Sequence, residues 1–524
     1  MLPPTRPALL LSTLLALVLT SGCGDSDPGT GPDPEPQEPP RIEIFLAESP
    51  ALLHGDFTRL RWRIDGADVA AITRDEPEVP AIGELDDVVD GAVSIRPHRD
   101  VTYTLLASNE WGTSEATATV TVSYPAAVFV DPLSGDDSDT GVGPDHPIAS
   151  LGEALLRTQG GGAIFLAGGD YDEPLVIDGA PRSVAGALDP ATFFEDSDRF
   201  RSTIRPTGES PLQIRNAAQG TSLITFVEFD ARNGGDVAGI IENSPAHLES
   251  CYLNGRDGVS GTGLRIQGTA DVTLRGCRIS GGRPIAGGTV HTETAGIRVD
   301  DSSALLATSC FIDGGRAFSV SSGVRVASTG SVRLGLNTIS AQIQQAGTGL
   351  TAACVRMFSG AAPAIGGNIL FTQGSGQRYA AIEEDPDADP SYFEGNLLVS
   401  VGVPPYRNHP DDYDLSGNPT ELGNPSTESE LNNHQRINSS ANRGPESVIL
   451  NRLLTGQSAL QLLVNAPQGD YHLVHPLAGG EPNPAKDAGD YNLADARYGP
   501  DLEDIDGDRR PSVPTQFDLG ADEF

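Results

Sequence analysis

Gly263-Leu-Arg-Ile266 is the phrase that decides the fold, and it returns as Gly296-Ile-Arg-Val299 and Gly323-Val-Arg-Val326. The copies belong to a repeat of about 24 to 33 residues that runs from about residue 239 to 400. Self-similarity at this spacing, carried by short alternating runs and Gly-rich connections, is typical of a solenoid in which each repeat forms one coil. We therefore expect function on a long lateral face of stacked strands.

Each coil reads as β-structure because apolar and polar residues alternate. This period of two puts one set of side chains inside the coil, namely Leu264, Ile266, Val272, Leu274 and Ile279, and leaves Arg265 and Thr273 outside. An α-helical repeat would instead show a period of 3.6 residues and far fewer glycines. The pattern predicts a parallel β-helix with three short strands per coil and glycine at the corners.

Two further columns follow the same repeat. The first lies fourteen residues after the repeated glycine and reads Val227, Cys251, Cys277, Cys310, Asn337, Asn368 and Asn396. The second lies two residues later and reads Phe229, Leu253, Ile279, Ile312, Ile339, Leu370 and Leu398. Coils stack about 4.8 Å apart, so equivalent residues become vertical neighbours and the asparagines can chain their side-chain amides. The cysteines at this spacing can be packed thiols or include one disulfide.

The first residues predict export. Arg6 precedes an apolar run over residues 8–19, and Thr20-Ser-Gly-Cys23 follows, so residues 1–23 have the pattern of a secretory signal. Residues 24–40 are acidic and Pro-rich and predict an extended tether. Short alternating runs in residues 41–124 predict a small antiparallel sandwich. We interpret this sandwich as a rigid spacer, and the alternative is that it binds a ligand.

Several motifs resemble known families. The coils, with Val128-Phe-Val-Asp-Pro132 and the segment 147–155 ahead of them, resemble the right-handed β-helix superfamily that includes pectate lyases and many surface proteins. The resemblance covers roughly residues 125–524 and implies a right-handed parallel β-helix, an N-terminal capping helix and a C-terminal closing segment.

Trp62 and Asn109-Glu-Trp-Gly112 resemble bacterial immunoglobulin-like modules. The residues before Cys23 resemble a bacterial lipobox, apart from Thr20 where leucine is usual, which implies lipidation of Cys23. The alternative is a plain secretory signal.

Composition narrows the partners. The chain has 34 Lys and Arg against 72 Asp and Glu, a net charge of −38, which argues against nucleic acid and anionic membrane surfaces as partners. Membrane contact is then expected through the lipid anchor only. We expect a monomer that needs no cofactor.

An outward-facing column contains the candidate ligand-binding residues. It reads Ile241, Arg265, Arg298, Arg325, Arg356 and Glu383. A second set lies in the loops five or six residues after the cysteine and asparagine column: Arg232, Arg256, Arg283 and Arg316. Stacked arginines repel unless an anion is near. In the resembled pectate lyases, strand and loop side chains form the groove for acidic polysaccharide, which suggests a cationic groove here. The alternative is pairing with the chain's own acids, such as Asp257, Asp300, Asp301 and Glu383.

Catalytic residues are weaker candidates. Asp300, Asp301 and Arg298 could serve a lyase with Ca²⁺ or a hydrolase with paired carboxylates. The Gly-His-Gly and Arg-x-Lys motifs of the resembled hydrolases are missing, and His291 is the histidine best placed to reach this face. Asp504, Asp506 and Asp508 alternate before a turn and are candidate Ca²⁺ ligands, although a structural role is the alternative.

Together these patterns predict an all-β, lipid-anchored cell-surface protein of a bacterial outer membrane or cell surface. The predicted function is non-catalytic recognition of polysaccharide or matrix glycans on the β-helix. A polysaccharide lyase or glycosidase, and a purely architectural envelope protein, remain the alternatives.

Overall fold

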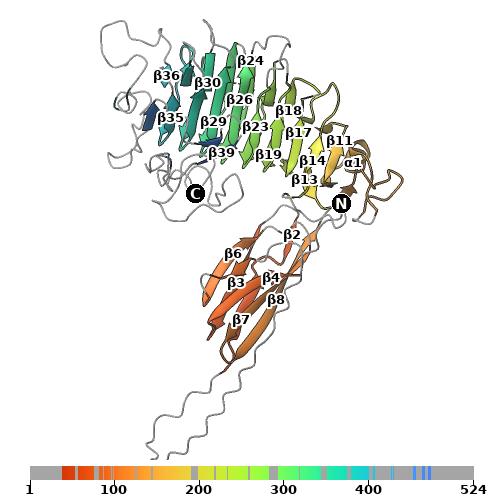
Figure 1. Cartoon of the computed structure of the whole chain (residues 1–524). Coiled ribbons are helices and arrows are strands. Elements are labelled where there is room, and N and C mark those ends of the chain that lie inside the picture. Colours follow the sequence, from red (N-terminus) through yellow and green to blue (C-terminus); the bar gives the residue numbers. More distant parts are fainter. Residues whose placement is uncertain are drawn as a thin grey trace, which may run out of the picture. The chain divides into compact units, whose positions relative to one another are not determined.

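The computed structural model describes residues 38–53, 57–75, 82–85, 88–95, 97, 100–123, 127–142, 146–190, 197, 199–217, 220–232, 234–257, 260–282, 293–317, 319–343, 351–373, 379–400, 405–407, 427, 429, 452–455, 463–465, 470–473 and 485. The chain divides into two compact units, of which the first holds most of a small β-sandwich and the second holds the solenoid (Figure 1). The signal segment, Cys23 and nearly all of the tether lie outside the described residues. The predicted domain boundaries stay predictions.

The sandwich has two sheets. One has the order β1-β3-β6, with β1 at Arg41–Ala47, β3 at Thr58–Asp65 and β6 at Asp90–Ile95. The other has the order β2-β8-β7-β4-β5, with β2 at Ala51–Leu53, β8 at Gly112–Ser123, β7 at Val101–Asn109, β4 at Val69–Arg74 and β5 at Gly83–Glu84. Strand β7 pairs antiparallel with β4, whereas β2 pairs parallel with β8. The predicted antiparallel sheet is present, with β4 paired antiparallel to both β5 and β7.

The core of the sandwich follows the predicted alternation. Every second residue of β3 is buried, and Trp62 is 6% exposed. A Cβ at Gly91 would lie 2.3 Å from the Trp62 ring, so only glycine leaves room for the indole at this point of β6.

The solenoid has three sheets that share each coil, and we name them sheets A, B and C in the order in which the chain visits them. Sheet A contains β9 Ala127–Val130, β10 Gly162–Ala167, β13 Arg182–Leu188, β16 Ser222–Thr225, β19 Pro245–Glu249, β22 Asp271–Arg275, β25 Ala304–Thr308, β28 Val332–Gly335, β31 Ala364–Gly366 and β34 Tyr392–Glu394. Sheet B contains β11 Gly169–Tyr171, β14 Ser202–Ile204, β17 Val227–Asp230, β20 Tyr252–Asn254, β23 Arg278–Ser280, β26 Phe311–Ala317, β29 Thr338–Ile343, β32 Ile369–Gln373, β35 Leu397–Ser400 and β37 Arg452–Thr455. Sheet C contains β12 Leu175–Asp178, β15 Leu212–Arg215, β18 Val237–Glu242, β21 Thr262–Gln267, β24 Glu293–Asp301, β27 Val320–Ser328, β30 Thr351–Met357, β33 Tyr379–Glu384 and β36 Tyr406–Arg407.

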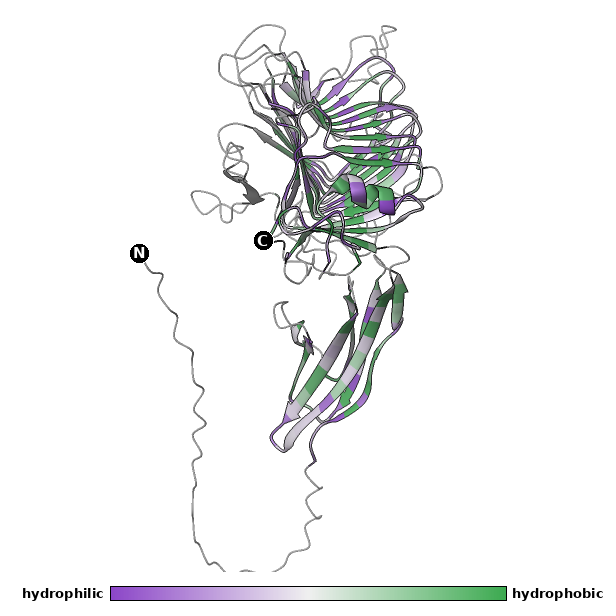
Figure 2. Cartoon of the chain, turned by 90° about the vertical axis from the view of Figure 1, so that its right-hand side faces the viewer, coloured by the Kyte–Doolittle hydropathy of each residue, from purple (hydrophilic) through white to green (hydrophobic). Residues whose placement is uncertain are grey.

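Strands of successive coils pair in parallel, as a β-helix requires. Within sheet C, β21 pairs parallel with β24 and β24 pairs parallel with β27. Figure 2 views these stacked coils from the end that carries the helix α1. Apart from the coils, a small antiparallel ribbon joins β38 Leu463–Asn465 to β39 Asp470–Leu473. The predicted fold class, a β-helix preceded by a small antiparallel β-unit, is confirmed.

The predicted register is confirmed. In the apolar column Leu253 pairs with Ile279, Ile279 with Ile312 and Ile312 with Ile339, and all four side chains are buried. In the column two residues earlier, Asn337 Nδ2 donates to Asn368 Oδ1 at 3.1 Å, and Asn368 Nδ2 donates to Asn396 Oδ1 at 3.0 Å. The asparagine ladder is fully buried, so its amides satisfy turn groups that water cannot reach.

The cysteines of this column are free thiols. Cys251, Cys277, Cys310 and also Cys354 are fully buried without a disulfide, which confirms the interpretation as core packing. The Cys277 Sγ donates weakly to Leu248 O and Arg275 O, both at 3.4 Å. These contacts occupy the places that the asparagine amides take farther along the solenoid.

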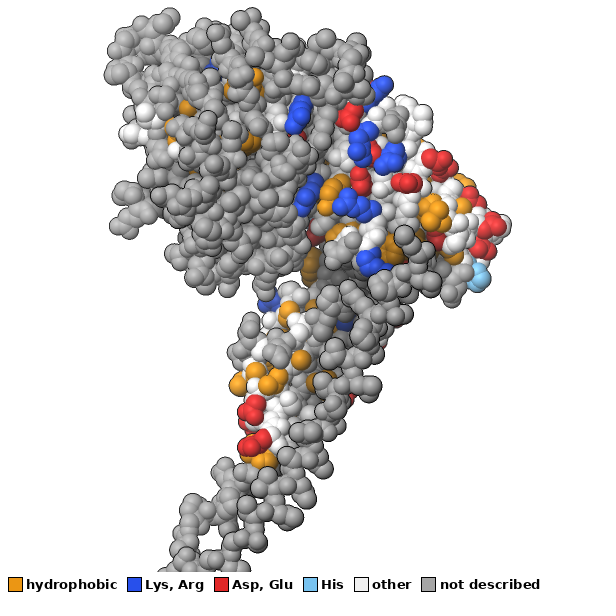
Figure 3. Space-filling model, viewed as in Figure 1, with side chains coloured by type: hydrophobic (Ala, Val, Ile, Leu, Met, Phe, Trp, Pro, Cys, Tyr) orange, Lys and Arg blue, Asp and Glu red, His pale blue; other side chains and the backbone are white. Residues whose placement is uncertain are grey.

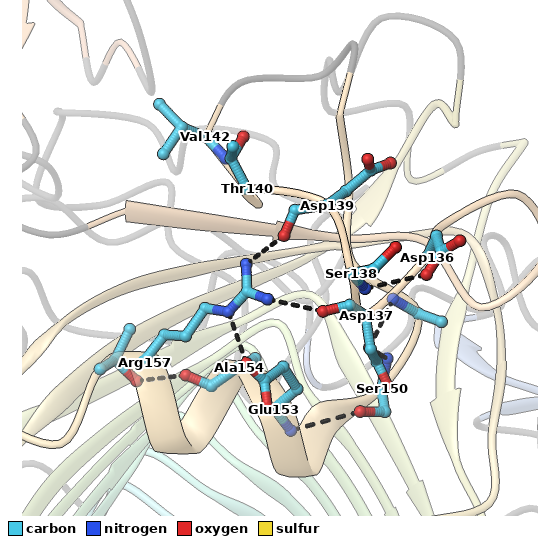
Figure 4. A network of polar contacts seen from close by, with 12 residues as sticks. Asp136, Asp137, Ser138, Asp139, Thr140, Val142, Ser150, Glu153, Ala154 and Arg157 are labelled. Atoms are coloured by element: carbon cyan, nitrogen blue, oxygen red, sulfur yellow. Dashed lines mark hydrogen bonds and ion pairs between the residues drawn. The ribbon is translucent and has the colours of Figure 1, made fainter.

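The first coil is closed by the short helix α1, Leu151–Arg157, at the predicted capping position. Ser150 caps its N-terminus by accepting a hydrogen bond from Glu153 N, and Leu151 and Ala154 are buried against the solenoid. Arg157 donates to Glu153 Oε1 and to the carbonyl oxygens of Asp137 and Asp139, which ties the preceding loop to the helix (Figure 4). The cap covers strand edges that would otherwise invite association.

Candidate functional site

The predicted arginine column exists on the outer face of sheet C. Arg265 pairs in register with Arg298, Arg298 with Arg325 and Arg325 with Arg356. We name these four residues the arginine ladder. Each arginine lies between two inward-facing apolar residues, so all four side chains point outward on a common face. Neighbouring strands in the sheet are about 4.8 Å apart. Glu383 follows Arg356 in the same column, as predicted.

The start of the column is different from the prediction. Arg265 pairs with Ile240, while Ile241 faces inward, pairs with Ile266 and is fully buried. The assignment was wrong by one residue because Gly239 is not the equivalent of the repeated glycine. It takes the inward position opposite Leu264, where a Cβ would lie 2.9 Å from the Leu264 side chain.

One carboxylate is shared by three arginines of the ladder. Arg298 Nε donates to Asp300 Oδ2 at 2.7 Å, and Arg325 Nη1 donates to Asp300 Oδ1 at 2.8 Å. Arg265 Nε lies 3.4 Å from Oδ2 of the same group. The Asp300 side chain is 12% exposed, whereas those of Arg298 and Arg265 are 34% and 39% exposed. The Arg325 side chain is 14% exposed, so it lies nearly as deep as the acid, and only the side chains of Arg298 and Arg265 reach the surface.

The far end of the ladder has its own partners. Arg325 Nε lies 3.3 Å from Glu293 Oε1, and Arg356 Nε lies 3.3 Å from Glu383 Oε2. Arg407 joins the column beyond Glu383, with Nη1 donating to Glu383 Oε1 at 3.2 Å.

A single aromatic ring supports two of these arginines. The guanidinium carbons of Arg325 and Arg356 lie 4.2 and 4.8 Å from the centroid of the Phe358 ring. Phe358, Glu293 and Arg407 were missed by sequence reasoning. Continuing the column by one more coil would have found Arg407, but the two-residue strand β36 gives no periodic signal.

The arginines of the column pair with acids of the chain and outnumber them. The arginines pair with the chain's own Asp300 and Glu383, as the alternative to a cationic groove proposed. Among the described residues of this face, the five arginines of the column, counting Arg407, contact three carboxylates, of Glu293, Asp300 and Glu383. Two positive charges are left in excess within these ion pairs, in a chain whose net charge is −38.

The two candidate catalytic carboxylates have different surroundings. The Asp301 backbone turns into a positive φ of 61°, and its Oδ2 accepts a hydrogen bond from Gly268 N at 2.9 Å. Asp300 faces the ladder because it lies two residues after Arg298 on the same strand. The pair is therefore split between a turn and the outer face of sheet C.

The loop arginines have separate partners. Arg232 bonds Asp230, Arg256 Nη1 donates to Asp236 Oδ1 at 3.0 Å, and Arg316 Nε donates to Gln342 Oε1 at 3.2 Å. Arg283 and His291 lie outside the described residues. The partners named here, Asp230, Asp236 and Gln342, are not the acids that pair with the ladder.

The described residues contain no group of three His, Cys, Asp or Glu side chains placed to hold a metal ion. The candidate Ca²⁺ ligands Asp504, Asp506 and Asp508 lie outside the described residues. In the described part of the chain, no helix has both the length and the apolar composition to cross a membrane.

Comparison with known proteins finds structural likeness only. No family model and no curated protein matches the chain. Pectate lyase Pel9A is 13% identical, with a TM-score of 0.31, covering 76% of this chain and 96% of its own. DFA-IIIase from Arthrobacter chlorophenolicus A6 is 10% identical, with a TM-score of 0.23, covering 52% of this chain and 95% of its own. The GH87 α-1,3-glucanase catalytic unit from Streptomyces thermodiastaticus is 12% identical, with a TM-score of 0.20, covering 64% of this chain and 85% of its own.

Proposed function

We propose that this protein is a monomeric, lipid-anchored cell-surface protein that binds acidic polysaccharide or matrix glycans on the arginine ladder without turning them over. The observation that carries the proposal is the sharing of Asp300 by three guanidinium groups. One carboxylate neutralises one positive charge, so this part of the face keeps an excess positive charge.

The ladder is also held in a geometry that suits oxyanions. Asp300 and the Phe358 ring fix the arginines from below and from the side, so little side-chain entropy remains to be lost on binding. Each guanidinium group has five N–H donors, and the contacts with Asp300 use only part of them. Carboxylate or sulfate groups of a glycan can accept the remaining hydrogen bonds in bidentate fashion.

One observation favours the architectural alternative, and another counts against the enzyme. The ion pairs with Asp300 and Glu383 suit an architectural role, in which the ladder only closes a solvated face. A lyase or hydrolase would use Asp300. The Asp301 carboxylate accepts a hydrogen bond from Gly268 N away from the ladder, which counts against the facing pair of carboxylates that the hydrolase interpretation needs.

The test incubates the purified protein with acidic and neutral oligosaccharides, with and without Ca²⁺. The expected result is binding without products that weakens with added salt. Unsaturated products, detected by ultraviolet absorbance, would establish a lyase, and new reducing ends without them would establish a hydrolase. Absence of binding to every glycan would leave the architectural role.

Arg298→Gln is the informative variant because it removes one of the positive charges around Asp300 and keeps a polar, uncharged side chain with part of the aliphatic stem. We expect its affinity to fall by about tenfold or more. Arg63→Gln is the matched control, since Arg63 pairs with Asp90 on the exposed surface of the sandwich. An equal loss of affinity in both variants would contradict binding on the ladder.

The anchor is part of the same proposal. Lipidation of Cys23 and the tether of residues 24–40 would hold the β-units away from the membrane at the outer membrane or cell surface. Cys23→Ala is expected to move the protein from the membrane fraction to the medium, and retention of the variant on membranes would contradict the anchor.

A further inference from the structure

A second cluster of arginines lies on the outer face of sheet B, which the proposed function does not use. Its outward column runs from Thr203 through Glu228 and Tyr252 to Arg278, in register across β14, β17, β20 and β23. Figure 3 shows basic and acidic side chains gathered over these strands. We name the group formed by Tyr252 with Arg201, Arg205, Arg232 and Arg278 the tyrosine patch.

A buried carboxylate organises one side of the patch. Asp230 is 1% exposed and accepts hydrogen bonds from Arg205 Nε at 2.7 Å and from Arg232 Nε and Nη2, both at 2.8 Å. The backbone N–H of Arg232 donates to it as well, at 3.0 Å. Burial pushes the pKa of Asp230 up, but the hydrogen bonds from Arg232 and Arg205 outweigh it and hold the pKa below its ordinary value. The carboxylate therefore stays charged and fixes both guanidinium groups.

The other side of the patch is built around Tyr252. The guanidinium carbon of Arg201 lies 4.9 Å from the ring centroid, and that of Arg278 lies 5.8 Å from it. Glu228 joins the two sides: its Oε1 accepts a hydrogen bond from Asn254 Nδ2 at 3.1 Å and lies 3.8 Å from Arg232 Nη2, and its Oε2 lies 3.6 Å from Arg201 Nη1.

The arginines keep donors for a ligand. The side chains of Arg201 and Arg232 are 60% and 48% exposed, and that of Arg205 is 36% exposed with Asp170 Oδ1 at 3.9 Å. The buried Asp230 binds Arg205 and Arg232, and these contacts use only part of the five N–H donors of each guanidinium group. A tyrosine ring and an asparagine amide beside them suit a ligand with an apolar face and hydroxyl groups as well as a charge.

We propose that the tyrosine patch is a second binding site, on sheet B, for a saccharide that bears a carboxylate or sulfate group. The oxyanion would lie against Arg201 and Arg232, and the sugar ring would contact the edge of Tyr252. The site goes beyond the proposed function because it lies on another sheet and shares no residue with the arginine ladder. Two sites on one solenoid would let a single chain hold a polymer at two points or bridge two polymers.

Isothermal titration of the full chain with short oligosaccharides tests the proposal. The probes are a sulfated disaccharide, a uronate disaccharide and an uncharged disaccharide, and the two charged probes distinguish the source of the oxyanion. The wild-type chain is expected to bind two molecules of a charged probe and none of the uncharged one. The combined variant Arg201→Gln and Tyr252→Leu is expected to lose the patch site, with affinity there falling by about tenfold or more.

The controls separate the two sites. Arg333→Gln, on an exposed position of sheet A, is expected to bind like the wild type. Arg298→Gln is expected to keep the patch site and weaken the ladder site. If the wild-type chain binds one molecule and only Arg298→Gln abolishes that binding, the tyrosine patch is overturned and the proposed function stands. If only the patch variant abolishes it, the proposed function is overturned and the tyrosine patch stands. Absence of binding by every charged probe would overturn both. Circular dichroism identical to the wild type shows that a loss is not unfolding.

Discussion

Replacing Asn368 by alanine is expected to destabilise the solenoid locally, because this side chain hydrogen-bonds buried backbone groups of the preceding coil and of its own coil. Its Oδ1 accepts from Asn337 N at 2.9 Å, and its Nδ2 donates to Leu334 O at 2.9 Å. Alanine leaves that N–H and that C=O without this partner in a site that water does not reach. Each orphaned group costs about 1–3 kcal/mol, so the loss of both partners should cost about 2–6 kcal/mol.

Cys277→Ala is the matched control, since Cys277 occupies the same column and is equally buried. Its sulfur makes only long hydrogen bonds of 3.4 Å, so its loss should cost about 1–2 kcal/mol, mostly as lost packing. The difference between the two variants in free energy of unfolding then reports the amide hydrogen bonds, because both variants leave a cavity.

Hydrogen exchange followed by mass spectrometry is the suitable assay, because a solenoid opens coil by coil and a global midpoint would dilute the effect. A loss of about 3 kcal/mol accelerates exchange of the amides in β29 and β32 by about a hundredfold. Strands β14 and β17, several coils away, should exchange as in the wild type. Acceleration by less than about fivefold, or the same acceleration in Cys277→Ala, would refute the assignment of stability to the asparagine ladder.

Three further outcomes are expected. Gly296→Ala should destabilise the solenoid by about 1–3 kcal/mol, since the new Cβ would lie 2.7 Å from both Gly323 O and Ile312 Cγ2, and an unchanged melting temperature would contradict that packing. The pKa of Asp230 is lower in the folded chain than its unfolded value of about 3.9, so the carboxylate stabilises the fold above that value and this stabilisation is lost as the pH falls through the folded pKa. Asp230→Asn should therefore lower the stability at neutral pH and make stability less dependent on pH in the acid range. An unaltered pH dependence in that range would show that the carboxylate is not held by the arginines. Burial raises the pKa of the Cys354 thiol, so a thiol reagent should label it only after denaturation, and rapid labelling of the native chain would contradict its burial.

The coils and their columns could be predicted from the sequence because a parallel β-helix converts spacing along the chain into vertical contact. The columns through Cys277 and Ile279 were placed correctly from the repeat alone. The prediction failed at Ile241, where a core-facing glycine imitated the repeated one. The alternation along a strand predicts which face a side chain is on, but a glycine mistaken for the repeated one shifts that prediction by one residue.

The sequence by itself determined which side chains share a face, since alternation and coil length decide that locally. Only the tertiary structure decided which charges meet, because a long arginine side chain selects among acids on several stacked coils. Asp300 rather than Asp301 joins the ladder, and Arg201 reaches across a neighbouring coil to Tyr252. No repeat in the chain relates Arg201 to Tyr252, and their meeting depends on how far a flexible side chain extends along the folded sheet.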